Sequence, residues 1–188
     1  LGSGTALDSA RLRKEIGELF KVDARSVHAY IMGEHGDSEF PVWSNANIGG
    51  MGLSEWIMRD PNITSKALSA VFNNVVSAAY KIIDAKGATY YGIGAALARI
   101  TKAIVNDEHS VQAISGYVNG EYGVSDVYVG TPAVISAEGA SHVLPISLDM
   151  KETEYMENSV RVIRSTIDLS FAKLEKDLGI KIPEGCVQ

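Results

Sequence analysis

The chain contains 188 residues, enough to bury a sizeable hydrophobic core in about one domain. Its 17 basic and 23 acidic residues give a formal net charge of −6, which provides no overall attraction for nucleic acid or an anionic membrane surface. A bound anion must therefore be held by locally placed cations. The single cysteine, Cys186, excludes an internal disulfide framework and fits a reducing cytoplasm, and no apolar run reaches the length of a membrane span.

The first residues, Leu1–Thr5, include two glycines and no initiator methionine. They have no targeting character, and we expect them to form a turn that enters a helix in the middle of a longer protein. A processed N-terminus is the alternative. Ser3 or Thr5 can cap the helix that follows.

The first helix is expected over residues 7–20, where apolar side chains recur at helical spacing. Residues advance by about 100° each around a helix. Asp8 and Arg11 therefore lie on one flank of the apolar stripe, and Arg13 lies on the opposite flank. One helix can thus contribute cations to two different sites.

A strand is expected over residues 26–32, because this stretch is rich in apolar residues and ends at a glycine. Strand alternation puts His28 and Met32 on the same face. The glycines on either side of the Glu34–His35 pair let the backbone turn sharply. His35 is therefore expected just past the end of the strand.

The rest of the chain combines long helical periodicities with a group of strands. Asn119-Gly120 and Glu138-Gly139 are tight-turn signals that favour an antiparallel meander. This order of elements predicts an α+β fold, with long helices packed on antiparallel sheets and residues 1–188 forming a single domain. The expected helices span residues 64–85, 92–106 and 152–178; the expected strands span 110–118, 126–136 and 141–148; residues 40–43 and 49–52 form connections, and 180–188 form a loose tail.

His35 is the first candidate for chemistry, because histidine exchanges protons near neutral pH. A carboxylate that accepts the Nδ1 proton would orient the ring and stabilise its charged form. Asp8, Glu34 and Asp37 are candidates for this role, although Glu34 is poorly placed because neighbouring side chains on an extended chain point apart. The alternative is a surface histidine in an acidic turn.

Two cation groups could bind anions. The planar guanidinium of Arg11 can hold a carboxylate through two parallel hydrogen bonds, but Asp8 and Arg11 could equally form an ordinary ion pair on a helix surface. Arg13 and His28 could meet if the first helix packs beside the strand, and a phosphate would suit that pair. The alternative is two unrelated surface cations.

Other patterns are weaker. Residues 92–97 begin like a dinucleotide-binding glycine motif, but Leu97 replaces the final small residue and no clear strand precedes it. His35 and Asp37 could belong to a metal site. The other three histidines show no ligand spacing to them, so we expect no bound metal.

Four motifs together are more specific. Gly2–Thr5, Leu7–Arg11, Gly33–Asp37 and Lys86–Thr89 look like the corresponding motifs in the C-terminal half of NAD-dependent L-lactate dehydrogenases, in the same order and at similar spacing. The similarity covers essentially the whole chain. It implies the fold of a lactate/malate dehydrogenase C-terminal domain, without the N-terminal Rossmann domain.

This resemblance implies a role for each candidate residue. His35 would exchange the proton with the substrate carbonyl or hydroxyl while NAD carries the hydride, with Asp8 paired to it and Arg11 gripping the substrate carboxylate. The further assignments are Ser9, Ala10 and Thr89 at the substrate, and Ser3 and Ile93 near the nicotinamide.

Arg13 and His28 match the bacterial subgroup that fructose 1,6-bisphosphate activates, in which the effector lies between subunits. The resemblance further implies a cytoplasmic homotetramer, built as a dimer of dimers, that catalyses the last step of lactic fermentation without a metal, nucleic acid or membrane partner. The glycine-rich nucleotide loop and the mobile loop with its catalytic arginine are not in these residues, so the 188-residue chain alone is expected to be inactive.

Three alternatives remain open from the sequence. Malate or another 2-hydroxy acid could be the substrate, because the main determinant of that choice lies in the missing loop; Thr89 and the pair Arg13 and His28 favour lactate. A non-catalytic oligomerisation module is the second alternative. The third is a metal-dependent hydrolase that uses His35 and Asp37.

Overall fold

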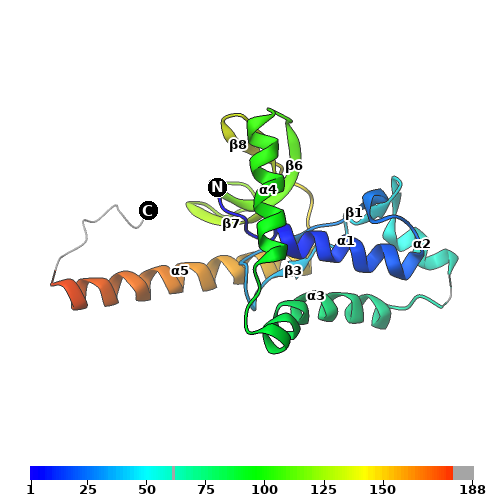
Figure 1. Ribbon diagram of the computed structural model, residues 1–188, viewed down its shortest axis with the longest axis horizontal. Coiled ribbons are helices and arrows are strands. Elements are labelled where there is room, and N and C mark those ends of the chain that lie inside the picture. The colour runs from blue at the N-terminus through cyan, green and yellow to red at the C-terminus, as the bar shows by residue number, and fades with distance from the viewer. Residues whose placement is uncertain (61, 180–188) are drawn as a thin grey trace.

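The computed structural model describes residues 1–60 and 62–179, and it confirms the predicted α+β fold. Helices α1 (Ala6–Phe20) and α3 (Ser65–Lys86) lie side by side, and α4 (Tyr91–Val105) stands against the largest sheet (Figure 1). These three helices begin and end within one residue of the bounds that the apolar periodicity predicted.

The largest sheet is the predicted antiparallel meander, with strand order β6 (Ser110–Val118), β7 (Val127–Ser136) and β8 (Gly139–Val143). The prediction for its third strand was displaced, because β8 starts two residues earlier and ends before Pro145. Proline has no N–H to donate to a ladder, and the backbone leaves the sheet just before it.

The prediction of one continuous strand over residues 26–32 was wrong in one respect, because two short strands form there. β1 (Val27–His28) pairs with β4, whereas β2 (Ile31–Met32) pairs with β3 in a separate sheet. The change of partner breaks the alternation, so Met32 is fully buried while His28 is exposed. The other short elements are η1 (Ala24–Ser26), β3 (Phe40–Pro41), β4 (Asn47–Ile48), β5 (Met51–Gly52) and α2 (Leu53–Arg59). None of them was predicted as a helix or strand, since residues 40–43 and 49–52 were expected to be connections.

The core consists of two clusters of buried apolar side chains. One joins the apolar stripe of α1, including Leu12 and Ile16, to Val75 of α3 and the short strands β1 and β4. The other joins the large sheet to the first half of the last helix, with Met156 fully buried. The turn that carries His35 leaves β2, whose two residues belong one to each cluster.

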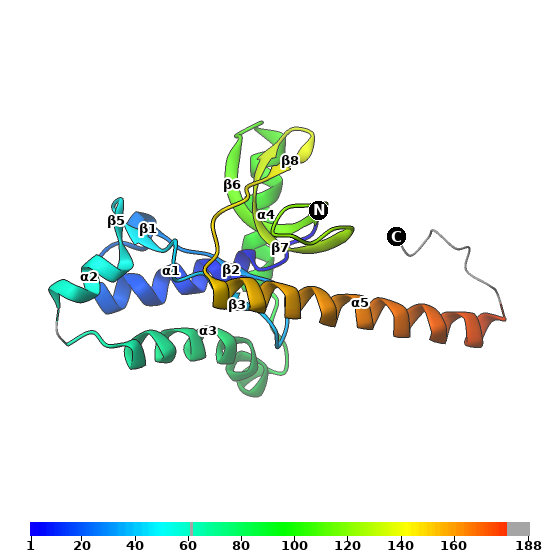
Figure 2. The same ribbon diagram turned by 180° about the vertical axis from the view of Figure 1, so that it is seen from behind.

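The last helix, α5 (Met150–Leu178), begins at a capping box formed by Asp149 and Glu152 and ends at Gly179, whose φ of +66° suits glycine. Its second half extends away from the rest of the chain (Figures 1 and 2), and Leu169 there is 70% exposed. Within the described ranges, no helix combines the length and apolarity that a bilayer crossing requires. The predicted tail over 180–188 lies outside the described residues.

Helix α1 is fixed to β2 by two buried hydroxyl groups. Ser9 Oγ accepts a hydrogen bond from Ile31 N at 2.9 Å and lies 3.3 Å from Ile31 O, and Thr5 Oγ1 donates to the same carbonyl oxygen at 2.6 Å. Thr5 is the N-cap residue of α1, but its hydroxyl makes no capping bond because it is committed to Ile31. The expectation of a side-chain cap by Ser3 or Thr5 was therefore wrong.

The end of β2 is also joined to the large sheet. Gly33 and Gly130 exchange two backbone hydrogen bonds, of 3.0 and 2.8 Å. Gly33 has a φ of +97°, and a Cβ atom on Gly130 would lie 2.6 Å from the Gly33 oxygen. Both positions therefore require glycine, and the turn that follows starts from a fixed point.

Replacement of Ser9 by alanine tests the contact between α1 and β2. The Ser9→Ala variant leaves the buried Ile31 N–H without its acceptor, which costs about 1–3 kcal/mol. Urea unfolding should show a loss of that size. In the matched control Ser170→Ala, which removes an exposed hydroxyl bonded to Thr166 O on α5, the change should stay within about 0.5 kcal/mol. Equal changes in both variants would contradict this role for Ser9.

Candidate active site

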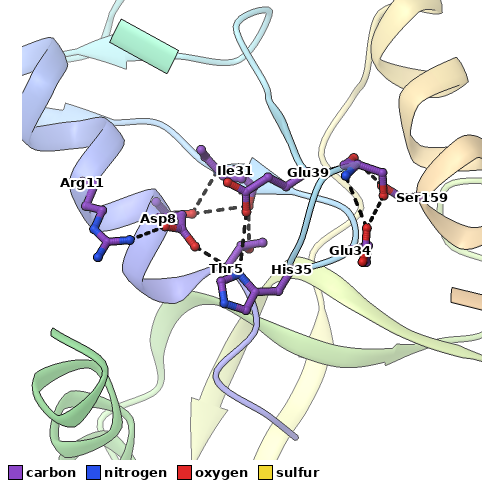
Figure 3. A network of polar contacts seen from close by, with 10 residues as sticks. Thr5, Asp8, Arg11, Ile31, Glu34, His35, Glu39 and Ser159 are labelled. Carbon is purple, nitrogen blue, oxygen red and sulfur yellow. Dashed lines mark hydrogen bonds and ion pairs between the residues drawn. The ribbon is translucent and has the colours of Figure 1, made fainter. Parts of the chain in front are cut away.

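His35, Asp8 and Arg11 lie together at the junction of α1 and the turn after β2 (Figure 3). His35 Nδ1 is 3.1 Å from Asp8 Oδ2, and the other carboxylate oxygen of Asp8 accepts a hydrogen bond of 2.7 Å from Arg11 Nη1. Asp8 therefore links the imidazole to the guanidinium. The spacing of Asp8 and Arg11 along α1 places both on the flank that faces the turn.

The Asp8 carboxyl is held in its ionised form. Its side chain is only 5% exposed, and this burial by itself favours the neutral form. The contacts with His35 and Arg11 outweigh burial, so the pKa of Asp8 lies below its usual value. An ionised Asp8 can orient the imidazole and stabilise its protonated state.

Glu39 is a second buried carboxylate in this site, and the sequence reasoning did not consider it. Its Oε2 lies 3.7 Å from His35 Nδ1, and its side chain is 6% exposed. Burial raises the pKa of Glu39 above its usual value, although its contact with His35 opposes that change. The only signal in the sequence was its position four residues after His35.

The two carboxylates favour a protonated imidazole. The contact with Asp8, followed by that with Glu39, raises the pKa of His35 to about 10, and burial of the ring opposes the increase. The His35 side chain is still 58% exposed, so its outer edge is accessible. His35 can therefore present a proton to a ligand at neutral pH.

A cavity of about 410 Å³ opens beside these side chains. Asp8, Arg11 and His35 line it, together with Thr89 from the connection before α4 and Ile93 from the first turn of α4. Apart from Asp8, Arg11 has no hydrogen-bond or ion-pair partner among the described residues, and its side chain is 17% exposed. The rest of its guanidinium is free to receive a carboxylate, within reach of the His35 proton. The apolar side chains that complete the wall are Leu7, Val76, Ala79 and Ile83.

Several predicted residues lie elsewhere. Ser9 is fully buried with its hydroxyl on Ile31, and Ala10 lines a different cavity, so neither side chain faces His35. Ser3 is not among the residues that line the 410 Å³ cavity. Glu34 turns away from His35 and accepts hydrogen bonds from Ser38, as its position in an extended chain suggested.

Asp37 lines the cavity but does not belong to the close group of potential metal ligands. Among the described residues, the one such group consists of Asp8, His35 and Glu39. Asp8 is already bonded to Arg11, a competing cation. The geometry therefore gives no support to a hydrolase that would use His35 and Asp37.

Arg13 and His28 line a second cavity, of about 450 Å³, on the opposite flank of α1. Arg25 and Arg99 also line it, but they pair with acidic residues, whereas no described carboxylate pairs with Arg13. Burial lowers the pKa of Arg13, and the nearby Tyr30 opposes this change. The cavity thus contains a partly buried cation that lacks a protein counter-ion.

Comparison with known families gives one match over most of the chain. Residues 5–174 match the family model described as the lactate/malate dehydrogenase α/β C-terminal domain. Among curated proteins, L-lactate dehydrogenase 1 of Enterococcus faecalis is 54% identical over 177 residues, and L-lactate dehydrogenase of Latilactobacillus sakei is 53% identical over 175 residues. These matches cover 94% and 93% of this chain but 54% of each relative, so the chain spans about half the length of those proteins.

Solved structures agree with this match. The lactate dehydrogenase MGS-M5, from a Medee basin deep-sea metagenome library, superposes with a TM-score of 0.86 at 47% identity. The minor L-lactate dehydrogenase of Enterococcus mundtii in its ligand-bound form also gives a TM-score of 0.86, at 42% identity. Each match covers 89% of this chain and 54% of the solved chain.

The elevated pKa of His35 predicts a pH-dependent contribution to stability. A group whose folded pKa is raised stabilises the fold fully below its unfolded pKa, near 6.5, and loses this effect as the pH rises through the folded value of about 10. The difference in melting temperature between the wild type and His35→Gln should therefore shrink between about pH 6.5 and pH 10. The effect should be modest because His35 is half exposed. A difference that stays constant over this range would contradict the charge interaction.

Proposed function

The chain belongs to the family of lactate/malate dehydrogenase α/β C-terminal domains, and on this premise we propose that it is the substrate-binding and proton-transferring half of an NAD-dependent L-lactate dehydrogenase. The observation that carries the proposal is the common cavity of Arg11 and His35, with Asp8 between them. A cation for a carboxylate and a proton donor for the neighbouring carbonyl are what a 2-oxo acid requires.

Each side chain has a separate role in the proposed reaction. Arg11 binds the substrate carboxylate through the guanidinium nitrogens that Asp8 leaves free, and this fixes the neighbouring carbonyl beside His35. Protonated His35 donates its Nε2 proton to the carbonyl oxygen of pyruvate, and neutral His35 removes a proton from the hydroxyl of lactate in the reverse direction. Asp8 holds the opposite edge of the ring and stabilises the imidazolium.

NAD supplies the hydride when it is bound, and the residues present fit a nicotinamide ring. Ile93 and the apolar side chains of α3 form a wall of the cavity that a flat ring could cover. We propose Ile93 for this contact. For Ser3 we keep only its position near the N-terminus of α1, where its backbone oxygen accepts a hydrogen bond from Ala6 N.

Lactate is preferred to malate or another 2-hydroxy acid because the curated relatives are named L-lactate dehydrogenases. We assign Thr89 to the substrate pocket, since it lines the cavity with His35. We propose no substrate contact for the side chains of Ser9 and Ala10, because the Ser9 hydroxyl is bonded to Ile31 and Ala10 lines the other cavity. The complete protein is proposed to be a cytoplasmic homotetramer of lactic fermentation, and exposed apolar residues such as Leu97 and Leu169 are suited to contacts with other subunits or domains.

Pyruvate reduction with NADH tests this function in a subunit that joins the chain to a nucleotide-binding half. His35→Gln removes the proton donor and should lower kcat/KM by about 100- to 10,000-fold. His142→Gln, on exposed β8, is the matched control and should retain activity. The 188-residue chain alone should not turn over, because it spans only about half of its relatives. Turnover by the chain alone, or full activity of His35→Gln, would contradict the proposal.

We also propose that the second cavity binds fructose 1,6-bisphosphate as an activator. This is supported by Arg13, a partly buried cation without a carboxylate partner, and by His28 in the same 450 Å³ cavity. A phosphate would provide the missing counter-ion. The cavity lies on the flank of α1 opposite the proposed substrate site.

The effector proposal predicts a selective loss of activation. Arg13→Gln and His28→Asn should each abolish most of the rate increase that fructose 1,6-bisphosphate produces in pyruvate reduction, because each removes a phosphate contact. The control Lys14→Gln removes a neighbouring cation of α1 that is exposed and paired with Glu18, and it should remain activated. Equal activation of all three variants would rule out this site.

A further inference from the structure

We propose that Glu39 is a positioning residue for His35, a second buried carboxylate that lies with Asp8 at the Nδ1 edge of the ring and favours the protonated imidazole through its charge. Its effect on the ring can be measured directly, whereas its consequence for catalysis rests on the proposed function. The proposal is carried by the geometry of the turn and by the unpaired oxygens that it buries.

The geometry places two buried carboxylates beside one ring nitrogen. Nδ1 of His35 carries a single proton, and it lies 3.1 Å from Asp8 Oδ2 and 3.7 Å from Glu39 Oε2. Neither oxygen accepts a well-aligned hydrogen bond from any described residue, and both are inaccessible to solvent. A buried carboxylate oxygen without a donor is costly, so a positive charge on the neighbouring imidazole stabilises both carboxylates.

The charge balance points the same way. The other titratable groups that line the cavity beside His35 are Asp8 and Arg11 from α1, Asp37 and Glu39 from its own loop, and Tyr80 from α3. Asp37 is exposed and therefore screened by solvent. When Asp8 and Glu39 are both ionised, the two carboxylates face one guanidinium, and the cluster carries one negative charge while His35 is neutral. Protonation of His35 brings it to neutrality.

The fold holds Glu39 in this position. Glu39 directly precedes β3, whose residue Phe40 pairs with Met32 of β2, so the two ends of the turn are joined. Ser159 of α5 donates a hydrogen bond of 2.6 Å to the backbone oxygen of Ser38, the neighbour of Glu39. These contacts fix the backbone on both sides of Glu39, and its carboxylate lies beside Asp8 and His35 (Figure 3).

The test removes the charge of the Glu39 side chain and keeps its shape. In the 188-residue chain, an NMR titration of the imidazole nitrogens should show that Glu39→Gln lowers the pKa of His35 by about one unit or more. The three other histidines serve as internal references. Glu34→Gln is the matched control, because Glu34 lies in the same loop but bonds to Ser38 and turns away, and it should leave the titration unchanged.

A second readout uses the complete enzyme. For Glu39→Gln, the alkaline limb of kcat/KM for pyruvate reduction should move to lower pH by the same amount. Glu39→Asp retains the charge and should restore the alkaline limb toward that of the wild type. A purely structural role for Glu39 would not produce this recovery. The same variant decides whether Glu39 acts through its charge if Glu39→Gln does not fold.

An unchanged His35 titration in Glu39→Gln, or equal shifts in Glu39→Gln and Glu34→Gln, would overturn the proposal. Absence of pyruvate reduction in the wild-type enzyme would instead refute the proposed function. The NMR result would still decide whether Glu39 acts on His35.

Discussion

The site depends on the buried contact between α1 and the Ile31 backbone. Ser9 and Thr5 bond both polar groups of Ile31, so the helix cannot slide or rotate along β2 without exposing or stranding them. Asp8 lies next to Ser9 on the same helix, and His35 follows four residues after Ile31. The distance between the carboxylate and the imidazole is therefore set by a bond between two main elements of the fold, and the mobility of a surface turn has little influence on it.

Two further contacts hold the same turn from other directions. The bridge between Gly33 and Gly130 fixes its start to the large sheet, and the bond from Ser159 fixes Ser38 to α5. The turn is thus held by α1, β7 and α5. The buried side chains of α1 belong to one core cluster, and those of β7 and α5 belong to the other. Residues that do not line the cavity consequently hold the proposed proton donor in place, which is the preorganisation that such a role requires.

The sequence predicted the elements whose signal is local. The apolar stripe of α1 lies within one element, and the Asn119-Gly120 turn signal directly follows β6, so the bounds of both were predicted within a residue. The division of the strand over 26–32 could not be predicted, because it depends on which distant strands pair with each half. Glu39 was missed for a related reason: the path of the turn, which the spacing does not specify, determines that it faces His35.

The two cavities share α1, and this limits how they could communicate. Arg11 faces one cavity and Arg13 the other, while Ser9 is bonded to Ile31 between them. A helix that is fixed in this way responds to a new contact by moving as a body together with β2. An anion at Arg13 would then shift Arg11 and Asp8 together, so the ion pair between them would be preserved. Its effect should therefore appear in how the proposed substrate carboxylate is bound at Arg11.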